Sequence, residues 1–433
     1  MDTIYALSSG APPAAIAVLR ISGPDAGAAL PALGITTRPT PRRATLATLR
    51  RGGSAGEVLD RAILLWFAGP ATVTGEDLLE LHLHGGRAVI RTVEAELARL
   101  PGFRLAEPGE FTRRALTAGR IDLTEAEGLA DLLAAETEGQ RRAAQRMSEG
   151  ALRQRVEQWT DRLLTLAAMI EALLDHGDEG DVLAERDLID GVRSGAAELA
   201  DAIAPVLAQP PVERLRDGVR VVLAGPPNAG KSTLLNALAE REAAIVSPIA
   251  GTTRDRIEAQ LVRNGIAYVL TDTAGLVTAT ADPIEAIGVA RARDAMASAD
   301  ILLWLDDAPP PASSSEVIAV HPRSDMPDRQ GPTRDGRLVL SARTGEGIGA
   351  LWARIEQVAR RLLPPPDIVA LNQRQRGLLS EVELALRSAV AQDDPVLIAE
   401  DLRAARVAFD RMTGRASVES MLDSLFGRFC IGK

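Results

Sequence analysis

One short stretch, residues 225–232, constrains this chain more than any other. It reads Gly-Pro-Pro-Asn-Ala-Gly-Lys-Ser and fits the pattern G-x-x-x-x-G-K-[ST] of the phosphate-binding P-loop. An apolar, β-branched run precedes it at 219–224, and a run with helical spacing follows at 233–238. This strand–loop–helix order lets backbone N–H groups and a helix N-terminus point at one phosphate. A glycine-rich turn that fits by chance would lack such flanks.

The side chains of the loop suit a nucleoside triphosphate with Mg²⁺. Lys231 can reach the β- and γ-phosphates, and the Ser232 hydroxyl can ligate Mg²⁺. The other expected phosphate-binding residues of the loop are Asn228, Ala229, Gly230 and Thr233.

Two downstream stretches have the composition of GTPase switch elements. The threonines of the stretch 249–255 can close over the γ-phosphate and complete the Mg²⁺ shell. An apolar strand then ends in Asp-x-x-Gly at 272–275, where Asp272 suits the outer Mg²⁺ shell and the Gly275 N–H suits the γ-phosphate. The further nucleotide contacts expected here are Ser247, Pro248, Ile249, Ala250, Gly251, Thr252, Thr253, Thr273 and Ala274. The combination predicts an α/β P-loop GTPase domain of the translation-factor-like class, Ras-like with a mostly parallel sheet.

The base-recognition motif departs from the GTPase pattern. Asn-Lys-x-Asp should follow an apolar strand, but Pro-Arg-Ser-Asp stands at 322–325, after the apolar run 317–320. Asp325 can accept from N1 and N2 of guanine, and Arg323 can stack on the base. Pro322 cannot replace the asparagine side chain, so we expect a guanine preference that is retained but weakened. The loop of the last strand, 338–343, adds three expected base contacts: Ser341, Ala342 and Arg343.

The usual water-orienting group is missing from this sequence. Leu276 stands where Ras-like enzymes carry a glutamine that orients the attacking water. Hydrolysis must therefore recruit another group, and the segment that follows supplies Asp282 and Glu285.

Length and composition limit the classes of protein to which this chain can belong. A length of 433 residues suggests two to four domains, and a net charge of −10 argues against a chain built mainly to bind nucleic acid by charge. Any RNA must meet a local patch or another protein. The single cysteine excludes an internal disulfide framework. Without a signal-peptide pattern or a transmembrane run, we expect a cytoplasmic protein with no membrane association.

Composition shifts divide the chain into four segments. Proline-rich breaks at 209–211 and 363–366 bracket the GTPase segment, so we expect it to be inserted between two halves of a helical domain. The expected segments are an N-terminal α+β domain at 1–118, helices at 119–212, the GTPase domain at 213–366 and helices at 367–433. Strands are expected at 15–21, 61–67 and 77–84 and helices at 87–99, 123–174, 183–207, 372–392, 395–413 and 418–426. Thr124 is expected to cap the long helix in a capping box with Glu127.

Several charged residues of the N-terminal segment have alternative interpretations. Arg20 and Glu80 on expected strands suit a solvated sheet face or an ion pair. His82 and His84 share a face, but no acid or cysteine cluster lies nearby, which favours a hydrogen-bonded or exposed pair over a metal site.

These motifs, together with Phe-Cys-Ile-Gly-Lys at 429–433, resemble the tRNA-modification GTPases of the MnmE (TrmE) family. The resemblance spans the whole chain and includes Leu-Arg-Ile-Ser-Gly at 19–23, Gly-Glu-Asp at 75–77 and Pro-Gly-Glu-Phe at 108–111. It departs at 9–15, which lacks the arginine and the glycine pair of the family's Pro-Pro-Gly-Arg-Gly-Gly-type loop.

The resemblance implies a K⁺-activated GTPase. With the FAD-dependent partner MnmG (GidA), such enzymes add an aminomethyl or carboxymethylaminomethyl group at C5 of the wobble uridine of certain tRNAs. A 5-formyl-tetrahydrofolate-type donor would bind in a homodimerising N-terminal domain. The implied folate contacts are Arg20, Glu80, Arg120 and Lys433. Arg120 stands where a lysine is common, which preserves charge but not shape.

The resemblance also assigns metal and catalytic roles within the GTPase domain. The implied K⁺ ligands are Asn228, Thr252 and the carbonyls of Ser247 and Ile249. The implied Mg²⁺ ligands are Ser232 and Thr253. Glu285 would orient water through a bridging water when two GTPase domains pair.

The lone cysteine and the overall activity each leave alternatives open. Cys430 is either a small buried hydrophobe or a reactive thiol whose thiolate is favoured by nearby Arg428 and Lys433. The alternative to a modification enzyme is a GTPase switch in ribosome assembly or signalling with docking domains. A non-enzymatic folate-binding scaffold is disfavoured by the intact P-loop and Asp272.

Overall fold

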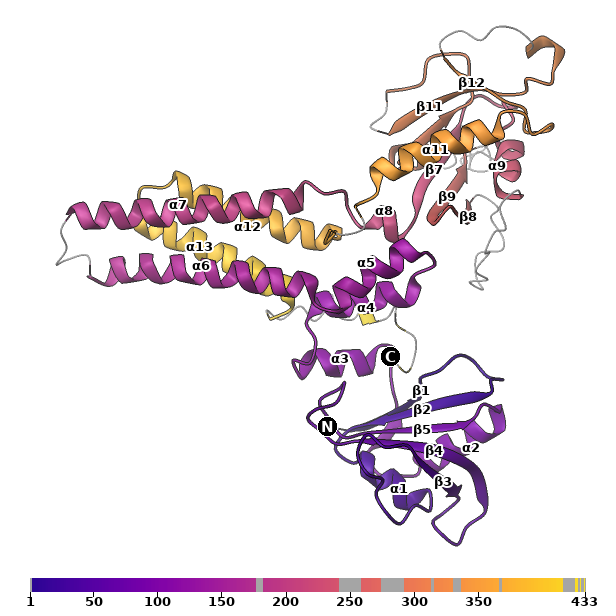
Figure 1. The fold of residues 1–433 in the computed structure, drawn as a ribbon, viewed down its shortest axis with the longest axis vertical. Coiled ribbons are helices and arrows are strands. Elements are labelled where there is room, and N and C mark those ends of the chain that lie inside the picture. The colour runs from indigo at the N-terminus through magenta and orange to yellow at the C-terminus, as the bar shows by residue number, and fades with distance from the viewer. Residues whose placement is uncertain are drawn as a thin grey trace, which may run out of the picture. The chain divides into compact units, whose positions relative to one another are not determined.

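The computed structural model describes residues 2–176, 182–240, 258–273, 292–312, 315–329, 336–365, 368–415, 425–426, 429 and 432. The chain divides into two compact units. The N-terminal unit comprises Met1–Ala130, Leu152–Val156 and Asp410–Lys433, and the large unit comprises Asp131–Ala151 and Glu157–Phe409. Figure 1 shows the fold and labels most of its helices and strands. The helix predicted at 418–426 lies mostly outside the described residues.

The N-terminal unit is built on a six-stranded sheet in the order β3-β4-β5-β2-β1-β6. Its strands are β1 (Thr3–Leu7), β2 (Ile16–Ser22), β3 (Thr45–Arg50), β4 (Val58–Phe67), β5 (Leu78–His84) and β6 (Phe103–Leu105). All neighbours are antiparallel except β1 and β6. The three strands predicted in this segment are confirmed as β2, β4 and β5, and the predicted helix is α2 (Arg87–Leu97).

Apolar side chains of this sheet and of α2 form one core. Leu19, Leu64 and Leu81 are fully buried and belong to the same cluster as Val93 and Leu97 of α2. Three short helices complete the segment: η1 (Ala26–Ala28), α1 (Ala29–Ala32) and α3 (Glu110–Thr117).

The long helical pattern after residue 119 is divided into three helices. They are α4 (Leu123–Ala134), α5 (Glu138–Ser148) and α6 (Ala151–His176). Thr137 caps α5 with Gln140 in a capping box, and Gly150 between α5 and α6 has a left-handed φ of 85°, which glycine adopts without steric cost. The prediction of one continuous helix is therefore wrong.

The predicted cap of this region is also wrong, because Asp122 takes the role assigned to Thr124. The Asp122 carboxylate accepts from the Glu125 N–H at 2.8 Å, and the Glu125 carboxylate accepts from the Asp122 N–H at 2.7 Å. The Thr124 hydroxyl donates to Asp122 at 2.8 Å. A carboxylate two residues earlier thus forms the reciprocal pair that defines a capping box.

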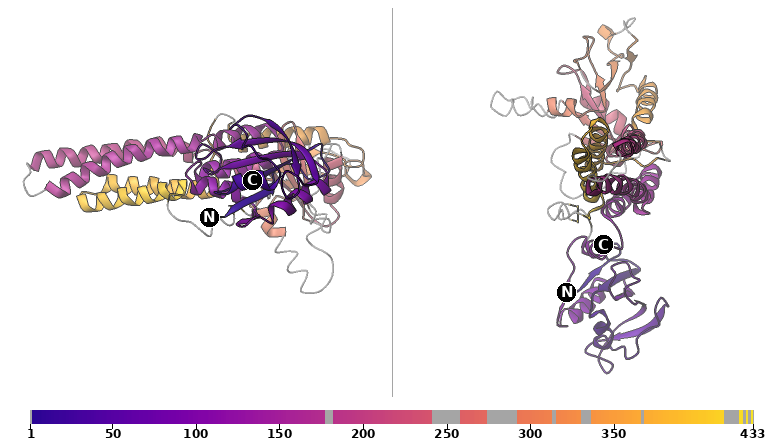
Figure 2. Two further views of the ribbon diagram at one scale, coloured as in Figure 1. Left: turned by 90° about the horizontal axis from the view of Figure 1, so that it is seen from below. Right: turned by 90° about the vertical axis from the view of Figure 1, so that its left-hand side faces the viewer.

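Helices from both sides of the GTPase segment lie side by side, for most of their length within the large unit (Figures 1 and 2). They are α6, α7 (Val182–Leu207), α12 (Gln373–Ala391) and α13 (Pro395–Thr413). Trp159 of α6 stacks on Phe409 of α13 with ring centroids 6.2 Å apart, and Arg193 of α7 donates to the Val390 carbonyl at 2.8 Å.

A second six-stranded sheet lies in the large unit, in the order β12-β11-β10-β7-β9-β8. Its strands are β7 (Val219–Ala224), β8 (Glu258–Arg263), β9 (Ile266–Asp272), β10 (Ile301–Trp304), β11 (Glu316–His321) and β12 (Leu338–Val339). All pairs are parallel except β8 with β9, which confirms the mostly parallel sheet. The last strand is shorter than predicted, because the chain turns at Ser341, whose hydroxyl accepts from the Thr344 N–H at 3.2 Å.

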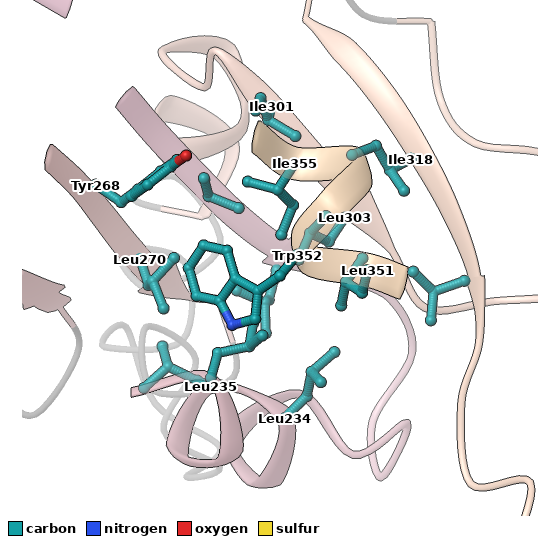
Figure 3. Packing of buried hydrophobic residues seen from close by; sticks show 14 of the residues in the cluster. Leu234, Leu235, Tyr268, Leu270, Ile301, Leu303, Ile318, Leu351, Trp352 and Ile355 are labelled. Atoms are coloured by element: carbon teal, nitrogen blue, oxygen red, sulfur yellow. The ribbon is translucent and has the colours of Figure 1, made fainter. Parts of the chain in front are cut away.

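The core of this sheet lies under α9 (Lys231–Glu240) and α11 (Ile348–Leu362). Figure 3 shows Leu234 and Leu235 of α9 below the Trp352 indole of α11, with Tyr268 of β9 beside it. The Tyr268 and Trp352 rings meet edge to face, with centroids 5.3 Å apart. Burial raises the pKa of Tyr268 above its usual value. Its buried hydroxyl has no hydrogen-bond partner among the described residues.

We predict that Tyr268→Phe leaves the free energy of unfolding unchanged or raises it by about 1 kcal/mol, because the substitution removes an unsatisfied buried hydroxyl and keeps the ring. Leu270→Ala in the same strand serves as the contrast and should cost about 2–5 kcal/mol. Urea unfolding of the full chain measures both. A loss above about 2 kcal/mol in Tyr268→Phe would show that the hydroxyl is satisfied.

Candidate nucleotide-binding site

The P-loop follows the central strand of the parallel sheet. Strand β7 pairs with β9 on one side and with β10 on the other, in a register that sets Leu223 opposite Asp272 and Ala224 opposite Trp304. The strands that follow β7 in the chain are therefore added first on one side of it and then on the other. Open α/β sheets bind ligands at the point where the strand order reverses in this way. The Thr273 hydroxyl donates to the Leu223 carbonyl at 2.8 Å, so the end of β9 is fixed beside the loop.

Three residues of the loop have positive φ: Gly225 (149°), Asn228 (61°) and Gly230 (93°). A Cβ on Gly225 would lie 2.8 Å from the Leu305 carbonyl oxygen, so this glycine is required by both its conformation and its neighbour. Asn228 is one of the few residue types other than glycine that tolerate the left-handed region. The loop therefore adopts the compact turn that the sequence pattern predicts.

Lys231 is buried at the start of α9. Its side chain is 5% exposed, and its Nζ donates to the carbonyls of Gly225 and Pro226, each at 2.8 Å. Burial lowers the pKa of this ammonium, and the negative charge of Asp272 opposes that effect. The lysine is thus oriented along the inside of the loop, where a phosphate chain would lie.

The side chains of Ser232 and Asp272 bring a hydroxyl and a carboxylate together next to Lys231. The Ser232 hydroxyl donates to the Asp272 carboxylate, and Asp272 is 4% exposed. Hydroxyl and carboxylate oxygens are the ligands that Mg²⁺ accepts in triphosphate sites. The donor set therefore fits the Mg²⁺ role predicted for Ser232.

The base-recognition loop, which contains residues 322–325, lines a cavity together with the P-loop. The Ser341 hydroxyl donates to Asp325 Oδ1 at 2.7 Å, and this hydrogen bond holds the pKa of Asp325 below its usual value. Asp325 is therefore an ionised acceptor, as recognition of N1 and N2 of guanine requires. Arg323, with a left-handed φ of 65°, donates through Nη1 to the Asn228 carbonyl at 3.3 Å.

One cavity of about 510 Å³ brings most of the described nucleotide residues together. Its wall contains Asn228, Ala229, Gly230, Lys231, Ser232, Thr233, Leu234, Pro322, Arg323, Asp325, Met326, Leu340, Ala342 and Arg343. Asp272, Thr273 and Ser341 adjoin it through the hydrogen bonds above. Leu234, Met326 and Leu340 were not predicted, because apolar residues in an amphipathic helix and a loop give no sequence signal for a ligand.

Many predicted site residues lie outside the described part of the chain. They are Ser247, Pro248, Ile249, Ala250, Gly251, Thr252, Thr253, Ala274, Gly275, Leu276, Asp282, Glu285, Arg428, Cys430 and Lys433. Their predicted roles stay predictions.

A second cavity, of about 390 Å³, lies in the N-terminal unit. Its wall contains Arg42, Phe67, Ala71, Thr72, Val73, Leu78, Glu80, Arg120 and Ile121. Arg120 donates to the Thr72 carbonyl at 3.0 Å, which sets the guanidinium in the cavity wall. Arg42, from a proline-rich loop without periodic pattern, was not predicted.

Arg20 and Glu80 form an ion pair at this cavity, as the sequence allowed. Arg20 Nε and Nη2 donate to Glu80 Oε1 at 3.0 and 2.9 Å. The two histidines have partners as well: His84 Nδ1 lies 2.6 Å from Asp60, and His82 Nε2 lies 3.4 Å from Glu80. Within the described ranges, no three His, Cys, Asp or Glu side chains gather as metal ligands would.

Comparison with known proteins shows to which family this chain belongs. A family model described as the MnmE helical domain matches residues 123–430, and one described as the GTP-binding protein TrmE N-terminus matches residues 3–120. The tRNA modification GTPase MnmE of Rhizorhabdus wittichii is 56% identical over 436 residues, covering 100% of this chain and 97% of the relative. The chain belongs to the MnmE family. The MnmE proteins of Erythrobacter litoralis and Novosphingobium aromaticivorans are 54% and 52% identical, each with full coverage of both chains.

Membership in the MnmE family agrees with the geometry of the P-loop cavity. Family members are named GTPases, and the wall of the cavity contains residues of the P-loop together with the carboxylate of Asp325. No helix in the described part of the chain is long and apolar enough to cross a membrane.

We predict that Asp325→Asn exchanges guanine for xanthine preference. The amide loses one of the acceptor contacts to guanine, so GTP affinity should fall about tenfold or more, while an amide N–H can donate to O2 of xanthine. Equilibrium titration with GTP and XTP measures the ratio of the two dissociation constants. An unchanged ratio would show that Asp325 does not contact the base.

Proposed function

We propose that this chain is a K⁺-activated GTPase that acts with MnmG (GidA) to modify C5 of the wobble uridine of certain tRNAs. The observation that carries the GTPase part is the single cavity shared by Lys231, Ser232 and Asp325. The names of relatives at 50% identity or more support the tRNA part. The proposed donor is 5-formyl-tetrahydrofolate or a related folate, and the proposed location is the cytoplasm.

The described residues suggest how the nucleotide would be held. Lys231 would bind the β- and γ-phosphates, and Asp325 would orient the base by accepting from N1 and N2. Ser232, with Thr253, would hold Mg²⁺, which supplies charge neutralisation on the transferring phosphoryl group. Asp272 would hold the Ser232 hydroxyl and a magnesium-bound water in place.

The proposed water-orienting group is Glu285, because Leu276 offers no polar atom. Asn228, in the wall of the cavity, would be one K⁺ ligand, with Thr252 and the carbonyls of Ser247 and Ile249. A monovalent cation there would offset negative charge on the phosphoryl group, as an arginine finger does.

We expect GTP hydrolysis to be faster in K⁺ than in Na⁺ of equal ionic strength, and Glu285→Ala to lose about 100-fold or more in kcat, as loss of general acid–base or water-orienting catalysis does. GTP affinity should change little in this variant. No K⁺ effect together with unchanged kcat in Glu285→Ala would contradict the mechanism. Slow hydrolysis with tightly retained GDP would instead favour a GTPase switch.

The N-terminal cavity is the proposed folate site, in a domain proposed to form the homodimer. Glu80 and Arg120 lie in its wall, and Arg20 is joined to Glu80. A carboxylate can accept from the N–H groups of a pterin, and guanidinium groups suit the glutamate carboxylates of a folate. Lys433, from the C-terminus, would complete the site.

We predict that Arg120→Gln weakens binding of 5-formyl-tetrahydrofolate about tenfold, the effect of losing one charged hydrogen bond. The matched control is Arg61→Gln, because Arg61 is an exposed arginine of β4 outside the cavity wall. Isothermal titration of the full chain gives both affinities. Equal affinities in both variants and the parent would place folate elsewhere.

A further inference from the structure

Three side chains join the start and the end of the base-recognition loop, and none of them belongs to a GTPase motif. The loop leaves β11 at His321 and ends in η2 (Pro327–Arg329). His321 Nε2 lies 3.1 Å from the Arg329 carbonyl, so the imidazole at the start of the loop lies against its other end. His321 Nδ1 lies 2.8 Å from Asp307 Oδ1. Asp307, His321 and Arg329 are called the loop clasp below.

Asp307 binds both other members of the loop clasp. Arg329 Nη1 donates to Asp307 Oδ2 at 2.6 Å, and Arg329 Nε donates to the Pro322 carbonyl at 3.4 Å. The hydrogen bond from His321, with the charge of Arg329, holds the pKa of Asp307 below its usual value. The Asp307 carboxylate thus ties the segment after β10 to both ends of the base-recognition loop.

The segment that carries Asp307 is itself fixed. Arg337 donates to the carbonyls of Asp306, Asp307 and Ala308, the last two at 3.0 and 3.2 Å. Trp304 Nε1 donates to the same Ala308 carbonyl at 2.9 Å. Asp307 is therefore held against the end of β10 rather than free on a mobile turn.

The loop sequence alone does not supply this constraint. The GTPase pattern has asparagine at 322, whereas Pro322 has no side-chain donor or acceptor. Arg323 is held at a φ of 65°, a left-handed backbone conformation that a residue other than Asn, Asp or Gly keeps only where surrounding contacts fix it. Contacts outside the loop must therefore hold Asp325 in its position beside Ser341.

We propose that the loop clasp determines base selectivity by positioning Asp325. None of its members is in the wall of the 510 Å³ cavity, so all three act through the loop as positioning residues. The clasp fixes both ends of the loop, and the Ser341 hydroxyl then needs only to orient the carboxylate. This inference rests on the GTP binding proposed above and concerns how that site distinguishes guanine from other purines.

The test compares GTP with ITP, which lacks the 2-amino group that Asp325 accepts from. Asp307→Asn keeps the shape of the side chain but weakens its hydrogen bonds to His321 and Arg329. His321→Ala removes the imidazole that lies between Asp307 and the Arg329 carbonyl. In both variants the ratio of the ITP to the GTP dissociation constant should fall about tenfold toward that of Asp325→Asn, as expected for one lost charged hydrogen bond. ITP affinity should fall less than GTP affinity, because inosine keeps the N1–H donor to Asp325 but lacks the 2-amino group, and the P-loop is unchanged.

Two matched variants separate positioning from general damage. Asp306→Asn removes the same charge one residue away and should keep the parent ratio, and Asp307→Glu retains a carboxylate and should keep most of it. An unchanged ratio in Asp307→Asn and His321→Ala overturns the proposal, as does equal loss of both nucleotides. A parent chain that binds ITP as tightly as GTP contradicts the guanine assignment itself, which distinguishes that failure from failure of the clasp alone.

Discussion

Hydrogen bonding on both edges of strand β7 is the constraint on which the nucleotide site depends. Because β7 pairs in parallel with β9 and β10, three chain segments end at the same edge of the sheet. They supply the P-loop, Asp272 and the segment that carries Asp307. The absence of a side chain at Gly225 lets the P-loop pass against the Leu305 carbonyl. A shift of register by one residue would separate Ser232 from Asp272.

A hydrogen bond between two residues with left-handed backbone conformations connects the P-loop to the base-recognition loop. Asn228 and Arg323 both have left-handed φ values, and the Arg323 guanidinium donates to the Asn228 carbonyl. Each strained residue therefore helps to fix the other. Since left-handed residues other than glycine occur mainly where surrounding contacts determine them, this hydrogen bond marks the two loops as one pre-organised site.

Local patterns predicted the elements and motifs that depend on neighbours in sequence. They failed where two nearby residues are equally suitable for one role, and where the contact is made between residues far apart in the chain. The P-loop, β7, the parallel sheet and the presence of Asp325 in the same cavity as the P-loop followed from motifs and apolar runs. The cap of α4 was misassigned because Thr124 and Asp122 are equally suitable in sequence, and only the reciprocal bond with Glu125 decides between them. The loop clasp had no sequence signal, since Asp307, His321 and Arg329 belong to different elements. The same holds for Arg42 in the N-terminal cavity.

The account rests on the claim that one cavity holds a guanine nucleotide, with Lys231 at the phosphates and Asp325 at the base. Equilibrium titration of the full chain with GTP and ATP, in the presence of Mg²⁺, tests this most directly. The account predicts tighter binding of GTP, by a margin smaller than an intact Asn-Lys-x-Asp motif would give, because Asp325 can accept from N1 and N2 of guanine and adenine offers neither donor there. ATP binding as tight as GTP binding would contradict it.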